Sequence, residues 1–373
     1  MFLRPSLRLS ATPSFTTHRI TTLQEEMGYT LPRLQATLAS LPQGDPQRLK
    51  VEAGIMNAYL QLNYYDEAIE AGKKFEAESE QITRIDPVFV IRQRHMLATA
   101  LREKQRFAEA EEIYMKGAPF LNRLNLDDAT HRKVRMDFVK DLGIFYLYQK
   151  KYNQASQVFS VSVKFSEGQI GLEKVHLTLQ NYLALSFGLT KNFDVALPQL
   201  ESIRQQWLTQ VSVGERETTL DYSLHLYHTA HVREKWAKQL FAENYSKNAN
   251  EQIQLAIRDL RESIRIREKL IPTRTSHTYT NSRLADPLWL LGKLLISIKQ
   301  TAEGKAYLRR ATTCYMQMNT PSGEQKARRV HEKWLSLRPR RHSIFASPSP
   351  QVQHADATSP AAQTSTASNT ARY

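Results

Sequence analysis

One pattern recurs along the middle of this chain and constrains its fold more than any other feature. An apolar residue stands beside a small one, an aromatic residue or Leu follows about one helical turn later, and a second aromatic precedes another small residue. In the clearest copy these positions are Leu142-Gly143, Tyr146, Tyr152, Ala155 and Phe159. Residues spaced by three or four positions share one face of a helix. The pattern therefore predicts two amphipathic helices joined by a short turn.

The same spacing returns in four further copies, which begin at Ile55, Leu97, Leu183 and Leu291. We expect the small residues at Gly143 and Ala155 to let the two helices of a hairpin approach closely, while aromatic rings fill the space around that contact. One hairpin leaves an apolar face exposed, so it must stack on the next to bury a continuous core. The sequence therefore predicts an all-α, right-handed superhelical solenoid of about six helical hairpins with a C-terminal capping helix.

These positions resemble those of the tetratricopeptide repeat, where Leu-Gly, Tyr, Ala and Phe recur in the same order. The interval from Ala68 to Ala110 is 42 residues, whereas the plain repeat has about 34. This longer period is similar to that of the kinesin light chains, as are the segments 181–184 and 264–270. The long heptad coiled coil of those proteins is missing here. The resemblance therefore covers roughly residues 45–318 and does not extend to the motor-adaptor role.

The predicted solenoid covers residues 26–321, and one interval within it departs from the pattern. Ala196 and Ala256 are 60 residues apart, so we expect an insertion or an extended helix around residues 205–235. After the last repeat, Ser322 and Gln325 have the spacing of a capping box. Residues 322–342 are therefore expected to form a basic capping helix and its extension.

The two ends differ in composition from the solenoid. Residues 1–25 contain Arg4, Arg8 and Arg19 among many Ser and Thr residues, with no acid before Glu25. This composition is typical of a mitochondrial presequence, and the alternative is a disordered leader. Residues 343–373 are rich in Ser, Thr, Ala and Pro and carry little apolar surface, so we predict a disordered tail.

The formal net charge of +14 is concentrated at the ends. The leader supplies three of these charges, and residues 326–341 supply six, as seven basic residues less Glu332. The seven are Lys326, Arg328, Arg329, Lys333, Arg338, Arg340 and Arg341. They form either a solvated face, which a capping helix needs, or a docking patch for RNA, lipid or an acidic protein.

Signals of catalysis are weak. The chain lacks a phosphate-binding Gly-x-x-x-x-Gly-Lys loop, a Gly-x-Ser-x-Gly elbow and a His-Glu-x-x-His helix. His225, His228 and His231 step by three along a helix and are better explained by packing than by a metal, while Cys314 is the single cysteine. The longest apolar stretch, residues 287–298, is shorter than the roughly 20 residues that span a membrane. We therefore expect no enzyme activity, no metal, no cofactor and no transmembrane segment.

A stack of hairpins presents the first helix of each one on a concave face, which suits binding. Carrying the repeat spacing across the copies predicts partner-binding positions at Asn57, Arg92, His95, Lys140, Asn181, Trp289 and Lys293. The expected partner is a protein that offers an extended acidic or polar segment. RNA is a less favoured partner.

The leading hypothesis is a protein-interaction scaffold or adaptor that assembles or stabilises a mitochondrial complex. One alternative is a cytosolic cargo adaptor similar to the kinesin light chain, which requires that residues 1–25 do not direct import. Another is a factor that binds RNA through the basic C-terminal helix, without sequence preference and with steep salt dependence.

Overall fold

The computed structural model describes residues 29–337, apart from residues 81, 83–84, 211, 213, 215–218, 271–276 and 319. These described residues form helices and turns and contain no strand. A helix over residues 29–40 is followed by α2 (Pro46–Gln61), α3 (Tyr65–Ser79), α4 (Pro87–Glu103), α5 (Phe107–Leu121), α6 (Ala129–Tyr148), α7 (Tyr152–Ser166), α8 (Glu173–Leu189), α9 (Phe193–Gln210), α11 (Leu220–Ala242), α12 (Ser246–Leu270), α13 (His277–Ser297), α14 (Thr301–Met316) and α15 (Pro321–Ser336). The all-α solenoid predicted from the sequence is confirmed.

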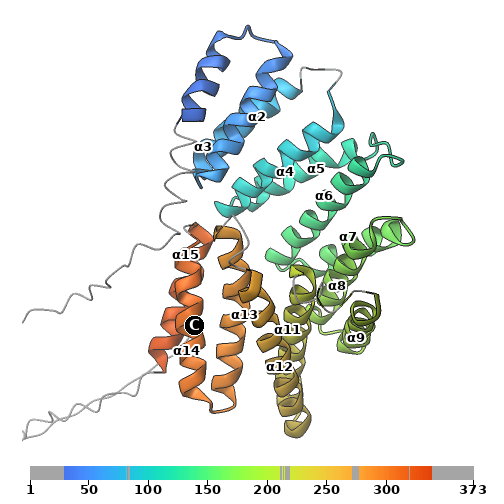
Figure 1. Ribbon diagram of the computed structural model, residues 1–373, viewed down its shortest axis with the longest axis vertical. Coiled ribbons are helices and arrows are strands. Elements are labelled where there is room, and N and C mark those ends of the chain that lie inside the picture. The colour runs from blue at the N-terminus through green and yellow to red at the C-terminus, as the bar shows by residue number, and fades with distance from the viewer. Residues whose placement is uncertain are drawn as a thin grey trace, which may run out of the picture. The chain divides into compact units, whose positions relative to one another are not determined.

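Six helical hairpins, from α2–α3 to α13–α14, make up the repeats within this described part of the chain (Figure 1). In each hairpin the first helix ends with a residue in the left-handed conformation, at φ between 59° and 68°. These residues are Asn63, Gln105, Lys150, Lys191, Asn244 and Lys299. The next backbone N–H then bonds back to a carbonyl five residues earlier, as in Arg106 N to Leu101 O at 2.8 Å. This Schellman geometry satisfies carbonyls that the helix end leaves unpaired, and its recurrence sets the same turn in every hairpin.

The first helices of the first three hairpins also begin alike. Asp45, Asp86 and Asp128 each accept a hydrogen bond from the backbone N–H two residues later, at 2.8, 2.9 and 2.6 Å. An aspartate in this position satisfies a backbone donor that the first turn cannot. In α2 and α4 a proline follows it at the first helical position, where its missing N–H costs nothing.

The close helix contact expected at Gly143 and Ala155 is present. Ala155 and Phe159 are fully buried, and a Cβ added to Gly143 would lie only 2.4 Å from the Phe159 ring. Aromatic rings continue this contact from hairpin to hairpin, since Phe159 stacks on Tyr182 of α8 at 5.2 Å between ring centroids. The small and aromatic positions of the repeat therefore do what their spacing predicted.

The interval around residues 205–235 contains an extended helix. Residues 205–210 belong to α9, and residues 220–235 lie in α11, which has 23 residues and pairs with the 25-residue α12. Trp207 near the end of α9 is buried against Tyr222 of α11, at 5.8 Å between centroids. The long spacing between Ala196 and Ala256 is thus taken up by longer helices and by the segment between α9 and α11.

α15 packs on α14 after the last hairpin and buries Ala327 and Val330, as expected for a capping helix. Its start differs from the predicted capping box. Thr320 accepts the hydrogen bond from the Gly323 backbone N–H at 3.0 Å, so Thr320 caps the helix and leaves the Ser322 side chain for another partner. The predictions for residues 1–25 and 343–373 lie outside the described residues.

Candidate partner-binding site

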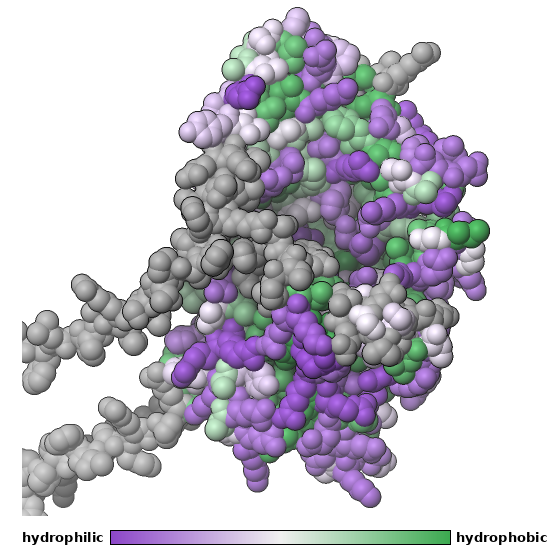
Figure 2. Space-filling view, viewed as in Figure 1, coloured by the Kyte–Doolittle hydropathy of each residue, from purple (hydrophilic) through white to green (hydrophobic). Residues whose placement is uncertain are grey.

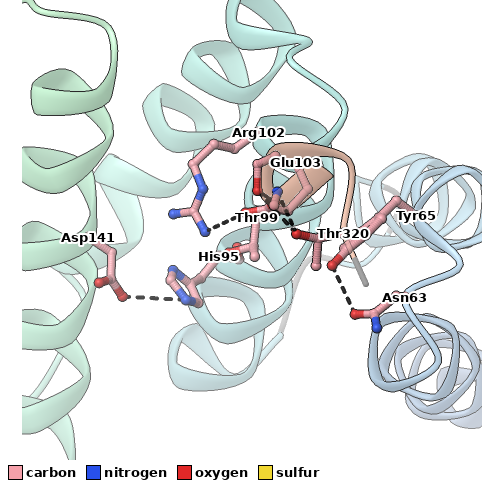
Figure 3. A network of polar contacts seen from close by, with 10 residues as sticks. Asn63, Tyr65, His95, Thr99, Arg102, Glu103, Asp141 and Thr320 are labelled. Carbon is pink, nitrogen blue, oxygen red and sulfur yellow. Dashed lines mark hydrogen bonds and ion pairs between the residues drawn. The ribbon is translucent and has the colours of Figure 1, made fainter. Parts of the chain in front are cut away.

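A polar stripe runs along α4. Arg92, His95, Thr99 and Arg102 are spaced by three, four and three residues and therefore share one helix face. Figure 3 shows His95, Thr99 and Arg102 on the side of α4 that faces Asp141 of α6. Arg92 is exposed, and the other three are partly buried. This stripe and the facing residues of α6 are called the α4–α6 face below.

α6 places two acids and a base opposite the stripe. His95 Nε2 lies 3.4 Å from Asp141 Oδ2, and Lys140 Nζ lies 2.8 Å from Asp137 Oδ1. Burial lowers the pKa of His95, and the opposing charge of Asp141 does not reverse that shift, so the ring is neutral at pH 7. Burial alone would lower the pKa of Lys140, but Asp141 and Asp137 raise it overall, so the ammonium stays charged.

This face offers a partner both signs of charge, and one of its polar atoms is buried without a partner in the described structure. Among the described residues, no group hydrogen-bonds to the buried His95 Nδ1. Figure 2 shows that the protein surface is hollowed near α4 and α6, with mostly hydrophilic side chains in view.

The end of α4 meets the last helix of the described chain. Arg102 lies 3.4 Å from Glu103 and 5.5 Å from the centroid of the Tyr148 ring. Glu103 Oε2 accepts a hydrogen bond from Ser322 Oγ at 2.7 Å, across 219 positions of sequence. The start of α15 therefore returns to the second hairpin, beside the polar stripe (Figure 3).

Asn181 occupies the same repeat position on α8 as His95 does on α4, but it is only 1% exposed. Its amide contacts His228 Nδ1 at 2.8 Å and His225 Nδ1 at 3.3 Å, both on α11. Burial lowers the pKa of His225 to about 3 and that of His228 well below its usual value. The prediction that Asn181 faces a partner is thus corrected, because α11 covers it and two neutral histidines use its amide.

Trp289 and Lys293 form a separate group on α13. The Lys293 ammonium lies 5.6 Å from the centroid of the Trp289 ring and 3.4 Å from the buried Glu234 carboxylate of α11. Burial, the largest influence, lowers the pKa of Lys293 despite the nearby Glu234. Both side chains are half-buried, and their contacts with each other and with Glu234 leave part of their surface exposed to a partner.

The basic residues of α15 divide in two. Lys326 turns inward, where its ammonium lies 3.1 Å from Asp286 and 5.4 Å from the centroid of the Tyr315 ring. Its side chain is partly exposed, and Asp286 compensates its charge. Arg328, Arg329 and Lys333 are exposed. The remaining predicted members, Arg338, Arg340 and Arg341, lie outside the described residues.

Asn57 on α2 is exposed and does not join the α4–α6 face. Of the predicted binding positions, Arg92, His95 and Lys140 come together on that face. Sequence reasoning missed Asp141 and Glu103, which set the charge of that face. The only signal for Asp141 is its place four residues after Asp137 on a predicted helix. Nothing in the sequence points to the contact of Glu103 with Ser322.

Within the described ranges, no group of three or more His, Cys, Asp or Glu side chains could hold a metal ion. No helix among the same residues is long and apolar enough to cross a membrane.

The fold is similar to that of a tetratricopeptide repeat protein from Parabacteroides merdae, with a TM-score of 0.50 and 12% identity over 85% of this chain and 99% of that one. The apo form of RapI has a TM-score of 0.49 and 10% identity, over 87% of this chain and 86% of that one. A putative kinesin light chain of Podosopora anserina has a TM-score of 0.45 and 17% identity, over 59% of this chain and 98% of that one. No protein-family model and no curated protein matches the sequence. The chain therefore has the fold of tetratricopeptide-repeat proteins.

Proposed function

We propose that this protein is an interaction scaffold that binds an extended segment of a protein partner along the α4–α6 face. The observation that carries this proposal is the set of polar groups from two first helices on one accessible surface. His95 and Lys140 are half-buried there, and Arg92 is exposed. Groups held in place by a rigid helical scaffold bind a segment at low ordering cost.

The expected segment carries acidic or polar side chains. Arg92 makes no ion pair with any described residue, and Lys140 lies at the same face with its charge maintained. Asp137 and Asp141 add negative charge beside Lys140, so the segment would also need donors. Complementary charges of this kind contribute to specificity and to the rate of association.

The binding test is a double charge reversal, Arg92→Glu with Lys140→Glu, in the tagged full-length chain. The matched control reverses Lys164 and Lys247, which are exposed on α7 and α12, and so changes the net charge equally. We expect co-purification of the partner to fall at least tenfold with the first pair and to persist with the second. Equal recovery with both pairs would contradict the proposed face.

We further propose that the scaffold acts in assembling or stabilising a mitochondrial complex. The basic, hydroxylated and acid-free composition of residues 1–24 supports this location. Residues 1–25 fused to a fluorescent protein should direct the fusion to mitochondria. A diffuse cytosolic signal would reject the location while leaving the binding proposal open to its own test.

A further inference from the structure

A cavity of about 450 Å³ lies in the first repeat, away from the α4–α6 face. The helix over residues 29–40, α2, α3 and the turn before α5 supply its walls. Glu52 and Tyr59 of α2 line it, together with Asp66, Glu67 and Glu70 of α3. Its lining thus includes four carboxyl groups, and two basic side chains, Lys74 and Arg106, accompany them.

Glu52 is the unusual group in this cavity. It is 2% exposed, and its Oε2 atom accepts no hydrogen bond from any described residue. The neighbouring carboxyl group of Glu78 is already paired with Arg48 at 3.1 Å, and Arg48 also donates to the carbonyls of Leu38 and Leu41. Burial and a side-chain hydrogen bond with Glu78 favour the protonated form of Glu52, whereas a cationic ligand would favour the carboxylate.

The rest of the lining also favours a cation. Arg106 is held by Glu109 through two bonds of 2.5 Å, which leaves its charge largely neutralised. Asp66 pairs with Lys104, whereas Glu67 and Glu70 make no ion pair with other described residues. Lys74 remains as one exposed base near the cavity, so carboxylates outnumber the uncompensated bases.

The wall beside Glu52 suits a planar cation. Ile55 and Tyr59 follow Glu52 at three and seven residues along α2, so all three side chains share one helix face. The Tyr59 hydroxyl accepts a hydrogen bond from Gln35 Nε2 at 3.1 Å, which holds the ring in place. A guanidinium group can stack on such a ring and bond a carboxylate with two parallel N–H groups, whereas an ammonium is a compact point charge.

We propose that this cavity binds an arginine side chain of a basic segment on a protein partner, with the guanidinium on the Glu52 carboxylate and against the Tyr59 ring. The site is distinct from the α4–α6 face in both position and charge. It gives the scaffold a second contact, for a segment of the opposite sign to that proposed for the α4–α6 face.

The proton on Glu52 provides an independent readout. Burial and the neighbouring Glu78 raise the pKa of Glu52 to about 7, while Arg48 and Lys74 act in the opposite direction. Asp66, Glu67, Glu70 and Arg106 are the other charged groups that line the cavity. Because the ionised form binds the guanidinium, affinity should rise several-fold between pH 6 and pH 8.

The test is fluorescence anisotropy of the full-length chain with three labelled peptides that differ only at one position, which is Arg, Lys or the uncharged analogue citrulline. We expect the Arg peptide to bind at least fivefold more tightly than the Lys peptide. The citrulline peptide should bind at least tenfold more weakly than the Arg peptide. Glu52→Gln keeps the side-chain shape and should weaken the Arg peptide at least tenfold and abolish the pH dependence.

Glu251→Gln is the matched control, since Glu251 is an exposed acid on α12. It should leave the affinity for the Arg peptide within twofold of the original chain. Circular dichroism checks that both variants are folded, and Tyr59→Leu gives a second variant of the site that should lower the preference for Arg over Lys. Equal affinities of the Glu52→Gln and Glu251→Gln variants, or equal binding of Arg and citrulline peptides, would overturn the proposal.

Discussion

The second and fourth hairpins place different chemistry at one repeat position. On α4 this position is His95, half-buried beside Asp141 and with one ring nitrogen unpaired among the described groups. On α8 it is Asn181, which is covered by α11 and bonded to two histidines. The repeat spacing is the same in both hairpins, so it does not determine whether the position reaches a partner.

The helix that packs next to each position accounts for the difference. Gly188 of α8 lets Val232 of α11 approach so closely that an added Cβ would lie 2.5 Å from it. The ring of Tyr182 then packs on His228 at 4.9 Å between centroids, and the polar groups of α8 are enclosed. α6 instead places charged side chains opposite α4. The side chains of the α4–α6 face therefore remain partly exposed, whereas the α8–α11 contact is buried.

The largest expected difference between the two regions is in acid sensitivity. Burial lowers the pKa of His225 to about 3 and of His231 to about 4, and that of His228 also falls well below 6.5. The unfolded chain protonates these rings near pH 6.5 and so binds more protons than the folded chain as the pH falls. Each buried ring should lower the free energy of unfolding by about 1.4 kcal/mol per pH unit below about 6.5.

Urea unfolding at pH 7.5, 6.5 and 5.5 measures this slope. His228→Gln should reduce the slope of the unfolding free energy against pH by about 1.4 kcal/mol per pH unit, which corresponds to one proton. His95→Gln should change this slope less, because His95 is more exposed and less fully desolvated. Equal slopes for the original chain and His228→Gln would show that the α8–α11 contact does not hold its histidines neutral.

A smaller effect is expected from Asn181→Ala. The substitution leaves His225 and His228 without the amide that bonds them, and a buried polar group left unpaired costs about 1–3 kcal/mol. Thr99→Ala on the α4–α6 face is the comparison, because Thr99 is partly exposed and its hydroxyl bonds the carbonyl of His95 within its own helix. It should change the free energy of urea unfolding by about 0.5 kcal/mol or less. Similar losses from both variants would remove the distinction between the regions.

A comparably small effect is expected from Asp141→Asn. The His95 ring is neutral at pH 7 and both side chains are partly exposed, so the lost contact is weaker than an ion pair and the loss should be about 0.5 kcal/mol or less. Differential scanning calorimetry at pH 7 would detect it. A loss as large as that from Asn181→Ala would place the α4–α6 face among the structural contacts.

Local spacing predicted the hairpins well because helix pairing and small-residue contacts depend on neighbours within one repeat. Gly143 against Phe159 is such a contact, and the structure contains it. The burial of Asn181 and the inward turn of Lys326 toward Asp286 depend on helices that are distant in sequence. The cap of α15 shows the same limit, since Ser322 fits a capping box locally but bonds Glu103 instead, leaving Thr320 as the cap.

Site-specific photocrosslinking tests most directly whether the α4–α6 face binds the partner. A benzophenone side chain is placed at Thr99 on this face or at Val161, an exposed position on α7, and the full-length chain is irradiated with its co-purified partner. We predict a crosslink from Thr99 to one continuous partner segment and none from Val161. A crosslink from Val161 alone, with the partner still bound, would contradict it.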